Sequence, residues 1–391
     1  MILGIDASNA GSGGINNYLR ELLKAAQPEK HGFTKVVVWA PSRVLKRLPE
    51  KSWLEKQNHP FLEKGLIYRQ LWQKIHLTKA LRQKCDLLYS PGGIYLNSFR
   101  PYVVCCMNML PFEKEEKDRF GMWTYWRFKI ERIMKDQLRS FKKATGVIFL
   151  SNYAYNYFTQ KYFKPHQNEV IAFGAKKLYF FDHKEQLAIN AYDQQNPFKI
   201  LYISPVSAYK HQWILAEAIA KLRKKGHPIE LNLSGRVNFK RAGKKLEEII
   251  NQYDPDQTFL KYHGFASDEK LLELRKETTA YAFSSSCENL PTILIEYMSS
   301  GRPIACSNKG PMPDCLQDAG FYFDPTSVES TMEGIEQMLL SPEKRQEHSE
   351  KAQSLAKEYV WEECADKTFS FLSQVGRKHA NAQLEKKSLS V

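Results

Sequence analysis

The 391-residue sequence has no long hydrophobic run. No apolar stretch approaches the ~20 residues that a membrane-spanning helix needs. The opening Met1-Ile2-Leu3-Gly4-Ile5-Asp6 is too short an apolar segment, and is charged too early, to be a signal peptide. We therefore expect a cytoplasmic protein without a membrane-spanning segment.

Pairs of cysteines with the C-x-x-C spacing are also absent. The chain has seven cysteines, an odd number, and most of them lie in apolar, strand-like runs, as reduced buried thiols do. This distribution favours neither a disulfide framework nor a zinc site. The cysteines are Cys85, Cys105, Cys106, Cys287, Cys306, Cys315 and Cys364.

Repeats with a period of roughly 20–50 residues and low-complexity tracts are missing as well, which argues against a solenoid. Hydrophobic residues make up 43% of the chain and charged residues 26%, so a folded core is possible and a disordered polyelectrolyte is excluded. At ~150 residues per domain, this length indicates two or three domains.

Acidic residues are scarce in the first half of the chain only. Residues 1–190 contain 31 Lys and Arg against 16 Asp and Glu, a net charge of +15, whereas residues 191–391 contain 26 against 27. All of the basic excess therefore lies in the first half. This asymmetry suggests that one domain meets an anionic partner, either a nucleic acid or an acidic membrane surface.

Apolar β-type runs alternate with helical stretches along nearly the whole chain. This rhythm predicts an α/β protein with parallel sheets covered by helices on both faces. Strands are expected at residues 2–6, 35–40, 86–89, 102–107, 146–150, 169–172, 199–204, 229–234, 258–262, 280–283, 303–306 and 320–323, and helices include residues 15–26, 70–84, 211–224 and 240–251.

A polar stretch at residues 182–197 reads as a linker. It predicts two doubly wound domains, residues 1–190 and 191–359, followed by a polar tail at residues 377–391. Ligands in doubly wound folds bind at the carboxyl ends of the strands. We therefore expect the functional site in a cleft between the two domains.

The most informative segment follows the predicted strand at residues 280–283. Asn289 is expected to cap a helix that has Pro291 in its first turn and ends near Gly301. Free backbone N–H groups at such a helix start suit a phosphate without any metal. Glu288 and Glu296 would bracket this anion site and accept hydrogen bonds from sugar hydroxyls. The alternative is two solvated surface carboxylates.

Three further motifs are open to two interpretations each. Lys210 lies between a strand and a helix, where it is either a cation in the cleft or a solvated surface group. The loop at residues 8–14 suits close approach to a phosphate, or it is a plain turn, and it is not G-x-G-x-x-G. The string Asp254-Pro255-Asp256 resembles a metal-binding D-x-D, but its polar surroundings predict a turn. We therefore assign no metal.

Residues 119–143 combine eight basic and two acidic residues with interleaved aromatic side chains. This composition suits a segment that lies on an anionic bilayer. An ordinary amphipathic helix with its aromatic face packed into the first domain would have a similar composition.

Taken in order, these motifs resemble the retaining nucleotide-sugar glycosyltransferases of family 4, and the similarity extends along most of the chain. Glu288 and Glu296 match the E-x(7)-E signature of that family. The resemblance implies the GT-B fold, with two Rossmann-like domains facing a central cleft and a C-terminal helix, at about residues 360–376, crossing back to the first domain. The other matching pieces are residues 4–6, 13–15, 146–151, 203–204, 209–211, 233–235, 263–264, 312–314, 318–325 and 359–363.

The resemblance also implies roles for the residues around this signature. Glu296 holds the ribose of the donor nucleotide, and Glu288 contacts the donor hexose. The backbone of Asn289, Leu290 and Pro291 lies against sugar and phosphate.

By the same resemblance, Lys210 neutralises the donor diphosphate. Many members carry a second cation five residues earlier, where this chain has Pro205. Help for Lys210 is then expected from Arg236, His211 or Arg302.

In the first domain, the resemblance assigns Gly13 and Gly14 to a loop that closes over the donor phosphate. The family's histidine aligns with residues 105–108, where this chain has no histidine. Asn108 could position an acceptor hydroxyl or the donor sugar by hydrogen bonds, but it cannot act as a general base near neutral pH.

The activity implied is hexosyl transfer with retention, without metal or cofactor, from a nucleotide diphosphate sugar to a glycan or glycolipid acceptor. We expect a lipid-linked oligosaccharide of O-antigen, capsule or exopolysaccharide synthesis as the acceptor, and attachment to the inner face of the cytoplasmic membrane. One alternative is a nucleotide-sugar 2-epimerase of the same fold, which would need more acid/base groups. Another is a nucleic-acid-binding protein, but no helix-turn-helix, zinc-finger or RNP-type string supports it, and we expect no nucleic-acid partner.

Overall fold

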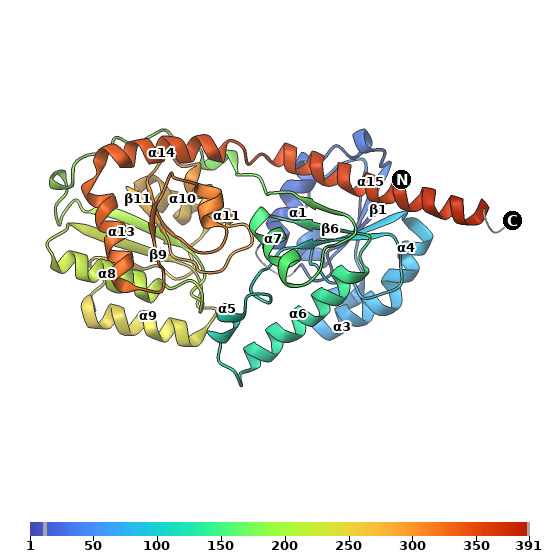
Figure 1. Ribbon diagram of the computed structural model, residues 1–391, viewed down its shortest axis with the longest axis horizontal. Coiled ribbons are helices and arrows are strands. Elements are labelled where there is room, and N and C mark those ends of the chain that lie inside the picture. The colour runs from blue at the N-terminus through green and yellow to red at the C-terminus, as the bar shows by residue number, and fades with distance from the viewer. Residues whose placement is uncertain (11–13, 389–391) are drawn as a thin grey trace. The chain divides into compact units, whose positions relative to one another are not determined.

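The computed structural model describes residues 1–10 and 14–388. The chain forms two compact units, each built on a parallel sheet (Figure 1). Unit 1 comprises Met1–Phe112, Phe128–Gly174 and Tyr359–Val391, and unit 2 comprises Glu113–Arg127 and Ala175–Glu358.

The sheet of unit 1 has the strand order β3-β2-β1-β4-β5-β6-β7, with every neighbouring pair parallel. Its central strands are buried on both faces, which explains why they read as continuous apolar runs. The strands are β1 (Ile2–Asp6), β2 (Lys35–Trp39), β3 (Leu54–Gln57), β4 (Leu87–Ser90), β5 (Tyr102–Cys106), β6 (Gly146–Phe149) and β7 (Asn168–Val170).

The helices of unit 1 connect these strands in the expected alternation. They are α1 (Gly14–Ala25), α2 (Ser42–Leu45), α3 (Leu66–Trp72), α4 (Thr78–Lys84), most of α6 (Tyr125–Lys143), α7 (Asn152–Lys161) and α15 (Trp361–Ser388). Between α3 and α4 runs a π-helical turn, η3 (Gln73–Leu77), and short 3-10 turns occupy η1 (Pro28–His31) and η2 (Pro60–Glu63).

Unit 2 repeats the architecture with the strand order β10-β9-β8-β11-β12-β13. Its strands are β8 (Phe198–Ile203), β9 (Ile229–Ser234), β10 (Leu260–Tyr262), β11 (Ala280–Phe283), β12 (Ile304–Ser307) and β13 (Phe321–Phe323). Its helices are α5 (Lys114–Asp118), α8 (Gln212–Lys224), α9 (Lys240–Tyr253), α10 (Asp268–Glu277), α11 (Thr292–Met298), α12 (Met312–Leu316), α13 (Val328–Leu340) and α14 (Pro342–Ala356), with 3-10 turns η4 (Lys177–Tyr179) and η5 (Ile189–Ala191).

All twelve predicted strands are present, and the structure adds β3, which the sequence did not predict. The predicted helix at residues 70–84 is interrupted by η3. The division between the units also differs from the predicted boundary at residue 190, because residues 175–190 belong to unit 2. Buried arginines of unit 2 bind this segment: Arg302 donates to the carbonyl oxygen of Asp182 at 2.8 Å, and Arg345 donates to that of Leu187.

The C-terminal helix α15 packs on unit 1 beside α1, as predicted (Figure 1). The ring of Trp361 stacks on Phe173 at 5.8 Å, and Ser373 Oγ donates to the carbonyl oxygen of His31 at 2.7 Å. Residues 377–388 of the predicted polar tail are helical, because α15 continues to Ser388. Residues 380–388 contain mostly good helix formers, so extending an existing helix is favourable. None of the helices among the described residues is long and apolar enough to cross a membrane.

Candidate functional site

Two loops meet at the carboxyl edge of the sheet in unit 2. One follows β8 and the other follows β11, and these strands are neighbours in the sheet. Ser284 Oγ donates to the carbonyl oxygen of Lys210 at 2.9 Å, and the Ser286 N–H donates to that of Tyr209 at 2.9 Å. The two loops therefore form one connected surface, which carries most of the residues predicted for the donor.

Lys210 and Glu288 form an ion pair on this surface. Their side chains are 11% and 17% exposed, so both are largely removed from water but remain reachable. The Lys210 ammonium also lies 5.1 Å from the ring centre of Tyr209. The interpretation of Lys210 as a solvated surface group is therefore wrong. Its charge is held next to the first glutamate of the E-x(7)-E segment, where a second anion could share it.

The helix that carries Glu296 starts later than expected. Pro291, with φ −79°, is the N-cap residue of α11, and no side chain caps this helix. Asn289 is therefore not the cap, which corrects the prediction. Asn289 and Leu290 are instead buried in the loop before the helix. Proline fixes φ, so Pro291 can start the helix without a side-chain acceptor.

The predicted end of this helix is confirmed. The last residue of α11 is Met298, and Gly301 adopts φ 62°. A Cβ on Gly301 would lie 3.1 Å from His183 Nδ1, so both the backbone conformation and the space favour glycine.

Glu296 lies on α11 in an ion pair with Arg275 of α10, with 2.6 Å between Oε2 and Nη2. The Arg275 side chain is 2% exposed, and its guanidinium carbon lies 4.3 Å from the ring centre of Tyr179. Burial raises the pKa of Glu296, and the Arg275 charge offsets part of that rise. Nothing in the sequence indicated Arg275, because it is 21 residues away on another helix.

A second, buried polar network also connects the two loops. His211 Nε2 lies 2.8 Å from Ser286 Oγ, which donates to Glu116 Oε2 at 2.8 Å. Glu116 lies on α5, from the first half of the sequence, and is buried in unit 2. Burial lowers the pKa of His211 to about 3, so its imidazole is neutral. His211 also adopts φ 50°, which is uncommon for a residue other than glycine.

The three side chains proposed to help Lys210 differ in accessibility. His211 is buried in the network with Ser286, and Arg302 donates to backbone carbonyl oxygens of its own unit. Arg236, in the loop after β9, is exposed, with its guanidinium carbon 3.9 Å from the ring centre of Phe265. Of the three, Arg236 is the exposed one, and it can reach a ligand without breaking hydrogen bonds such as those that hold His211 and Arg302.

The remaining predicted residues lie in unit 1. Gly14 is exposed at the start of α1, and Gly13 lies outside the described residues. Asn108 is exposed just after β5, and its Oδ1 accepts the Leu110 N–H at 3.0 Å. By contrast, Lys210, Glu288 and Glu296 lie in unit 2.

Unit 1 has a polar cluster at the end of β1 that the sequence did not predict. The buried Asp6 accepts hydrogen bonds from the side-chain amide of Gln73 in η3 at 2.7 Å and from the Ser8 N–H at 3.0 Å. Burial raises the pKa of Asp6.

Asp254, in the D-x-D string, stabilises the turn that was predicted there. It accepts the backbone N–H groups of Thr258, Phe259 and Leu260 at 2.7–2.9 Å. Burial acts to raise the pKa of Asp254, but these hydrogen bonds outweigh it and lower the pKa. Among residues 1–10 and 14–388, no three or more His, Cys, Asp or Glu side chains form a cluster suited to a metal. Six of the seven cysteines are buried, and Cys85 is partly exposed.

Comparison with known families places this site in context. Residues 184–355 match the family described as Glycosyl transferases group 1. This region is similar to that family and spans less than half of the chain. It contains Lys210, Arg236, Arg275, Glu288 and Glu296.

Proteins similar to the chain include a curated relative and several solved structures. O-antigen chain mannosyltransferase B of Escherichia coli is 30% identical over 112 residues, which span 29% of this chain and 29% of that protein. The sucrose-phosphate synthase from Thermosynechococcus elongatus is 15% identical, with a TM-score of 0.72 over 98% of this chain and 100% of the other. Anabaena Alr3699/HepE in complex with UDP-glucose is 18% identical, with a TM-score of 0.69 over 97% and 100%. The chain has the predicted GT-B fold of two Rossmann-like domains.

Proposed function

We propose that the protein is a retaining glycosyltransferase of family 4, which moves a hexosyl unit from a nucleotide diphosphate sugar to an acceptor hydroxyl. The observation that carries this proposal is the Lys210–Glu288 ion pair, on the same loop-and-helix segment as Glu296, inside the region that matches the group 1 family. This segment offers one cation for a diphosphate and two carboxylates for sugar hydroxyls. Similarity to an O-antigen chain mannosyltransferase and to a protein crystallised with UDP-glucose is consistent with this chemistry.

In this proposal the donor replaces one internal contact by several new ones. The diphosphate takes the Lys210 ammonium, and the exposed Arg236 adds a second positive charge. Glu288 is then released to accept hydrogen bonds from the hexose, while the backbone of Asn289, Leu290 and Pro291 lies against sugar and phosphate. Glu296, oriented by Arg275, accepts the ribose hydroxyls.

The proposed transfer step needs no enzyme nucleophile. The bond between the anomeric carbon and the diphosphate oxygen breaks, and the acceptor oxygen bonds to the same face of that carbon. The leaving diphosphate takes the acceptor proton. Lys210 and Arg236 stabilise the charge that develops on the diphosphate, and Asn108 positions the acceptor or the sugar. No resident cofactor takes part in this reaction.

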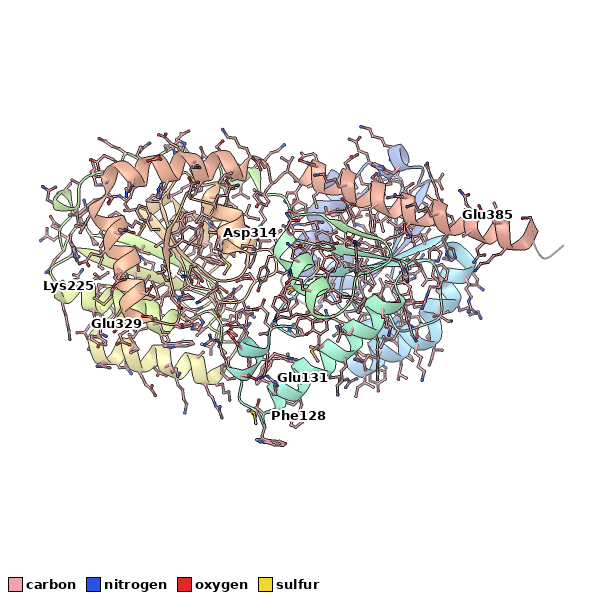
Figure 2. All side chains as sticks on the ribbon, viewed as in Figure 1. Phe128, Glu131, Lys225, Asp314, Glu329 and Glu385 are labelled. Carbon is pink, nitrogen blue, oxygen red and sulfur yellow. The ribbon has the colours of Figure 1, made fainter. Side chains whose placement is uncertain are left out.

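We further propose that the acceptor is a lipid-linked oligosaccharide and that the protein works on the inner face of the cytoplasmic membrane. The segment at residues 119–143 supports this proposal. Phe120 and Phe141 are buried, whereas Trp123, Tyr125 and Phe128 are 86%, 75% and 61% exposed. Figure 2 labels Phe128 near the start of α6. Exposed basic residues continue along the helix at Arg132, Lys135, Arg139, Lys142 and Lys143.

Ligand binding tests the donor part of the proposal. A calorimetric and thermal-shift panel of UDP, GDP, ADP and their sugars should identify one nucleotide that stabilises the protein, by ~2.7 kcal/mol at a hundredfold excess over its Kd. Lys210→Ala should weaken the binding of that nucleotide, and Lys276→Ala, which removes an exposed lysine of the same unit, should not. Binding of none of these nucleotides would overturn the proposal.

Chelation tests the role of the cationic side chains. Because Lys210 and Arg236 supply the positive charge in this proposal, transfer should continue at an unchanged rate in EDTA. Loss of transfer that Mn²⁺ or Mg²⁺ restores would contradict the metal-independent mechanism. The anomeric configuration of the product, followed by NMR, tests retention directly.

A further inference from the structure

Unit 1 exposes a group of large apolar side chains, here called the α3 patch. It consists of Ile67, Tyr68, Leu71 and Ile75 on α3 and η3, together with Leu96, and these residues are 72%, 44%, 40%, 56% and 45% exposed. Single exposed apolar residues are ordinary, but a contiguous group marks an interaction surface.

The α3 patch follows from the way this helical segment packs. Trp72, Leu77 and Leu81 face inward and are at most 2% exposed. Residues 67, 71 and 75 are spaced by four, so they follow one side of the helix. The segment is therefore apolar on two sides, and only one of them is covered by the core of unit 1.

Leu96 belongs to the patch because its loop is tied to the same segment. Asn97 Nδ2 donates to the carbonyl oxygen of Gln73 at 2.8 Å, and Arg82 Nη2 donates to Ser98 Oγ at 3.2 Å. These hydrogen bonds hold the loop against η3 and α4. Contacts within unit 1 therefore hold Leu96 in place next to the rest of the patch.

Basic residues predominate around the patch, although Glu63 of η2 directly precedes this segment. Residues 64–84 contain six Lys and Arg and no Asp or Glu. Helix α6, with its exposed bases, is close by: the Tyr95 N–H donates to Ser140 Oγ of α6 at 2.9 Å, and the Tyr95 hydroxyl lies 3.4 Å from Thr78 Oγ1 of α4. Figure 1 shows α3, α4 and α6 along one side of unit 1.

An apolar strip inside a basic rim matches an anionic bilayer. Aliphatic side chains gain by entering the boundary between headgroups and acyl chains, while Lys and Arg remain with the anionic headgroups. A nucleic acid would bind the Lys and Arg side chains, but it has no aliphatic layer that could take up Ile67, Leu71 and Ile75. The combination therefore favours lipid over nucleic acid.

We propose that the α3 patch inserts into the surface of an anionic membrane and provides the salt-resistant part of the attachment, while the bases of α6 provide the salt-sensitive part. This inference rests on the proposed function, because attachment to a membrane brings the protein to its lipid-linked acceptor. Binding to lipid is nevertheless measured separately from donor binding.

Co-sedimentation of the full chain with vesicles of phosphatidylglycerol and phosphatidylcholine tests the proposal. Ile67→Gln/Leu71→Gln/Ile75→Gln should weaken binding at least tenfold and remove the part that persists in high salt. Lys135→Glu/Arg139→Glu/Lys142→Glu/Lys143→Glu should remove the part that salt screens. Vesicles of phosphatidylcholine alone should bind the wild type much more weakly.

Matched controls change equally exposed residues elsewhere. Leu340→Gln/Leu384→Gln alters two leucines that are 56% and 66% exposed, and Lys240→Glu/Lys276→Glu/Lys344→Glu/Lys357→Glu alters four exposed lysines of unit 2. Neither control should lose the vesicle affinity that its partner variant loses. A polarity-sensitive dye on Ile75→Cys should shift to the blue on vesicles, and a dye on Leu384→Cys should not.

The outcomes separate this inference from the proposed function. Unchanged sedimentation of the α3-patch variant, equal binding to neutral vesicles, or tighter binding to RNA than to anionic vesicles would overturn the inference. Nucleotide binding by the same variant should equal that of the wild type. If the α3-patch variant loses vesicle binding and the wild type binds none of the nucleotides, the membrane inference holds and the proposed transferase function is refuted.

Discussion

The two units use their charged residues in opposite ways. Among residues 1–10 and 14–388, unit 1 buries one charged side chain, Asp6, while unit 2 buries nine. These nine are Glu113, Glu116, Lys117, Lys210, Glu230, Asp254, Arg275, Arg302 and Arg345. Unit 1 instead places its basic excess on the surface, around the exposed apolar residues of the α3 patch.

This difference fits the partners that we propose for the two units. A buried, paired charge is costly to form but has a fixed orientation, which suits recognition of a small polar ligand. An exposed charge has no fixed orientation but attracts any surface of opposite sign. We therefore expect substitutions in unit 2 to change donor chemistry and substitutions on the surface of unit 1 to change attachment.

The largest effect is expected at Glu288. Glu288→Gln keeps the shape but removes the charge that we propose lies next to the reacting sugar, so kcat should fall by about a hundredfold or more. The Kd of the nucleotide diphosphate should not rise, because Lys210 no longer has to leave an ion pair with Glu288. Steady-state kinetics and isothermal titration measure the two effects. Glu247→Gln, an exposed carboxylate of α9, is the control, and vesicle binding should be unaffected in both. Full turnover by Glu288→Gln would contradict the comparison.

Next in size is the pair of Glu296 and Arg275. Glu296→Ala should weaken nucleotide binding by about tenfold or more, because it removes the acceptor for the ribose. Titration calorimetry measures it, and affinity equal to the wild type would refute the assignment of Glu296.

Arg275→Met sharpens that test. It leaves the buried Glu296 without its counter-charge, which raises the pKa of Glu296 further, so nucleotide binding should weaken as the pH falls. The unfolding free energy should drop by roughly 3 kcal/mol. Arg275→Lys should restore part of both. A pH profile of binding that matches the wild type would show that Arg275 only fills space.

A smaller effect is expected at His211. Its pKa is about 3 in the folded protein against an ordinary 6.5, so between these values the unfolded chain binds the extra proton. Stability should therefore fall as the pH drops through this window, by at most ~1.4 kcal/mol per pH unit from this group. His211→Gln should flatten the dependence of Tm on pH, and the exposed His166→Gln should not. Equal slopes in all three proteins would contradict the buried neutral imidazole.

The smallest effect is expected at Glu116. Glu116→Gln weakens one charge-assisted hydrogen bond to Ser286 and the contact with Arg119, which lies 2.8 Å from the carboxylate. The expected loss is about 1 kcal/mol of stability, with a modest rise in the KM for the donor, because Ser286 lies two residues before Glu288. Thermal unfolding and donor kinetics check it. A fall in vesicle binding instead would contradict the assignment of membrane attachment to unit 1 and of donor chemistry to unit 2.

The local sequence pattern was enough to predict the strands that are buried on both faces of a sheet. A strand buried on both faces tends to be apolar along its whole length, so runs such as residues 36–39 and 102–106 can be recognised in the sequence. By contrast β3, Leu54-Glu55-Lys56-Gln57, is half-buried at an edge and mostly polar, and it forms because β2 offers it a parallel partner. Its composition contains no signal that could have indicated a strand.

The order of the motifs was likewise sufficient to predict the fold and the grouping of Lys210 with residues 288–296. The reason is that parallel strands bring their carboxyl ends to one edge of the sheet. The ion pair between Arg275 and Glu296, the network of His211, Ser286 and Glu116, and the inclusion of residues 113–127 in unit 2 were decided by the tertiary structure alone. Each joins residues that are 21 to 170 positions apart, across elements whose packing no local pattern records. Periodicity shows which side of a helix is buried, but contacts between helices depend on how the whole chain packs.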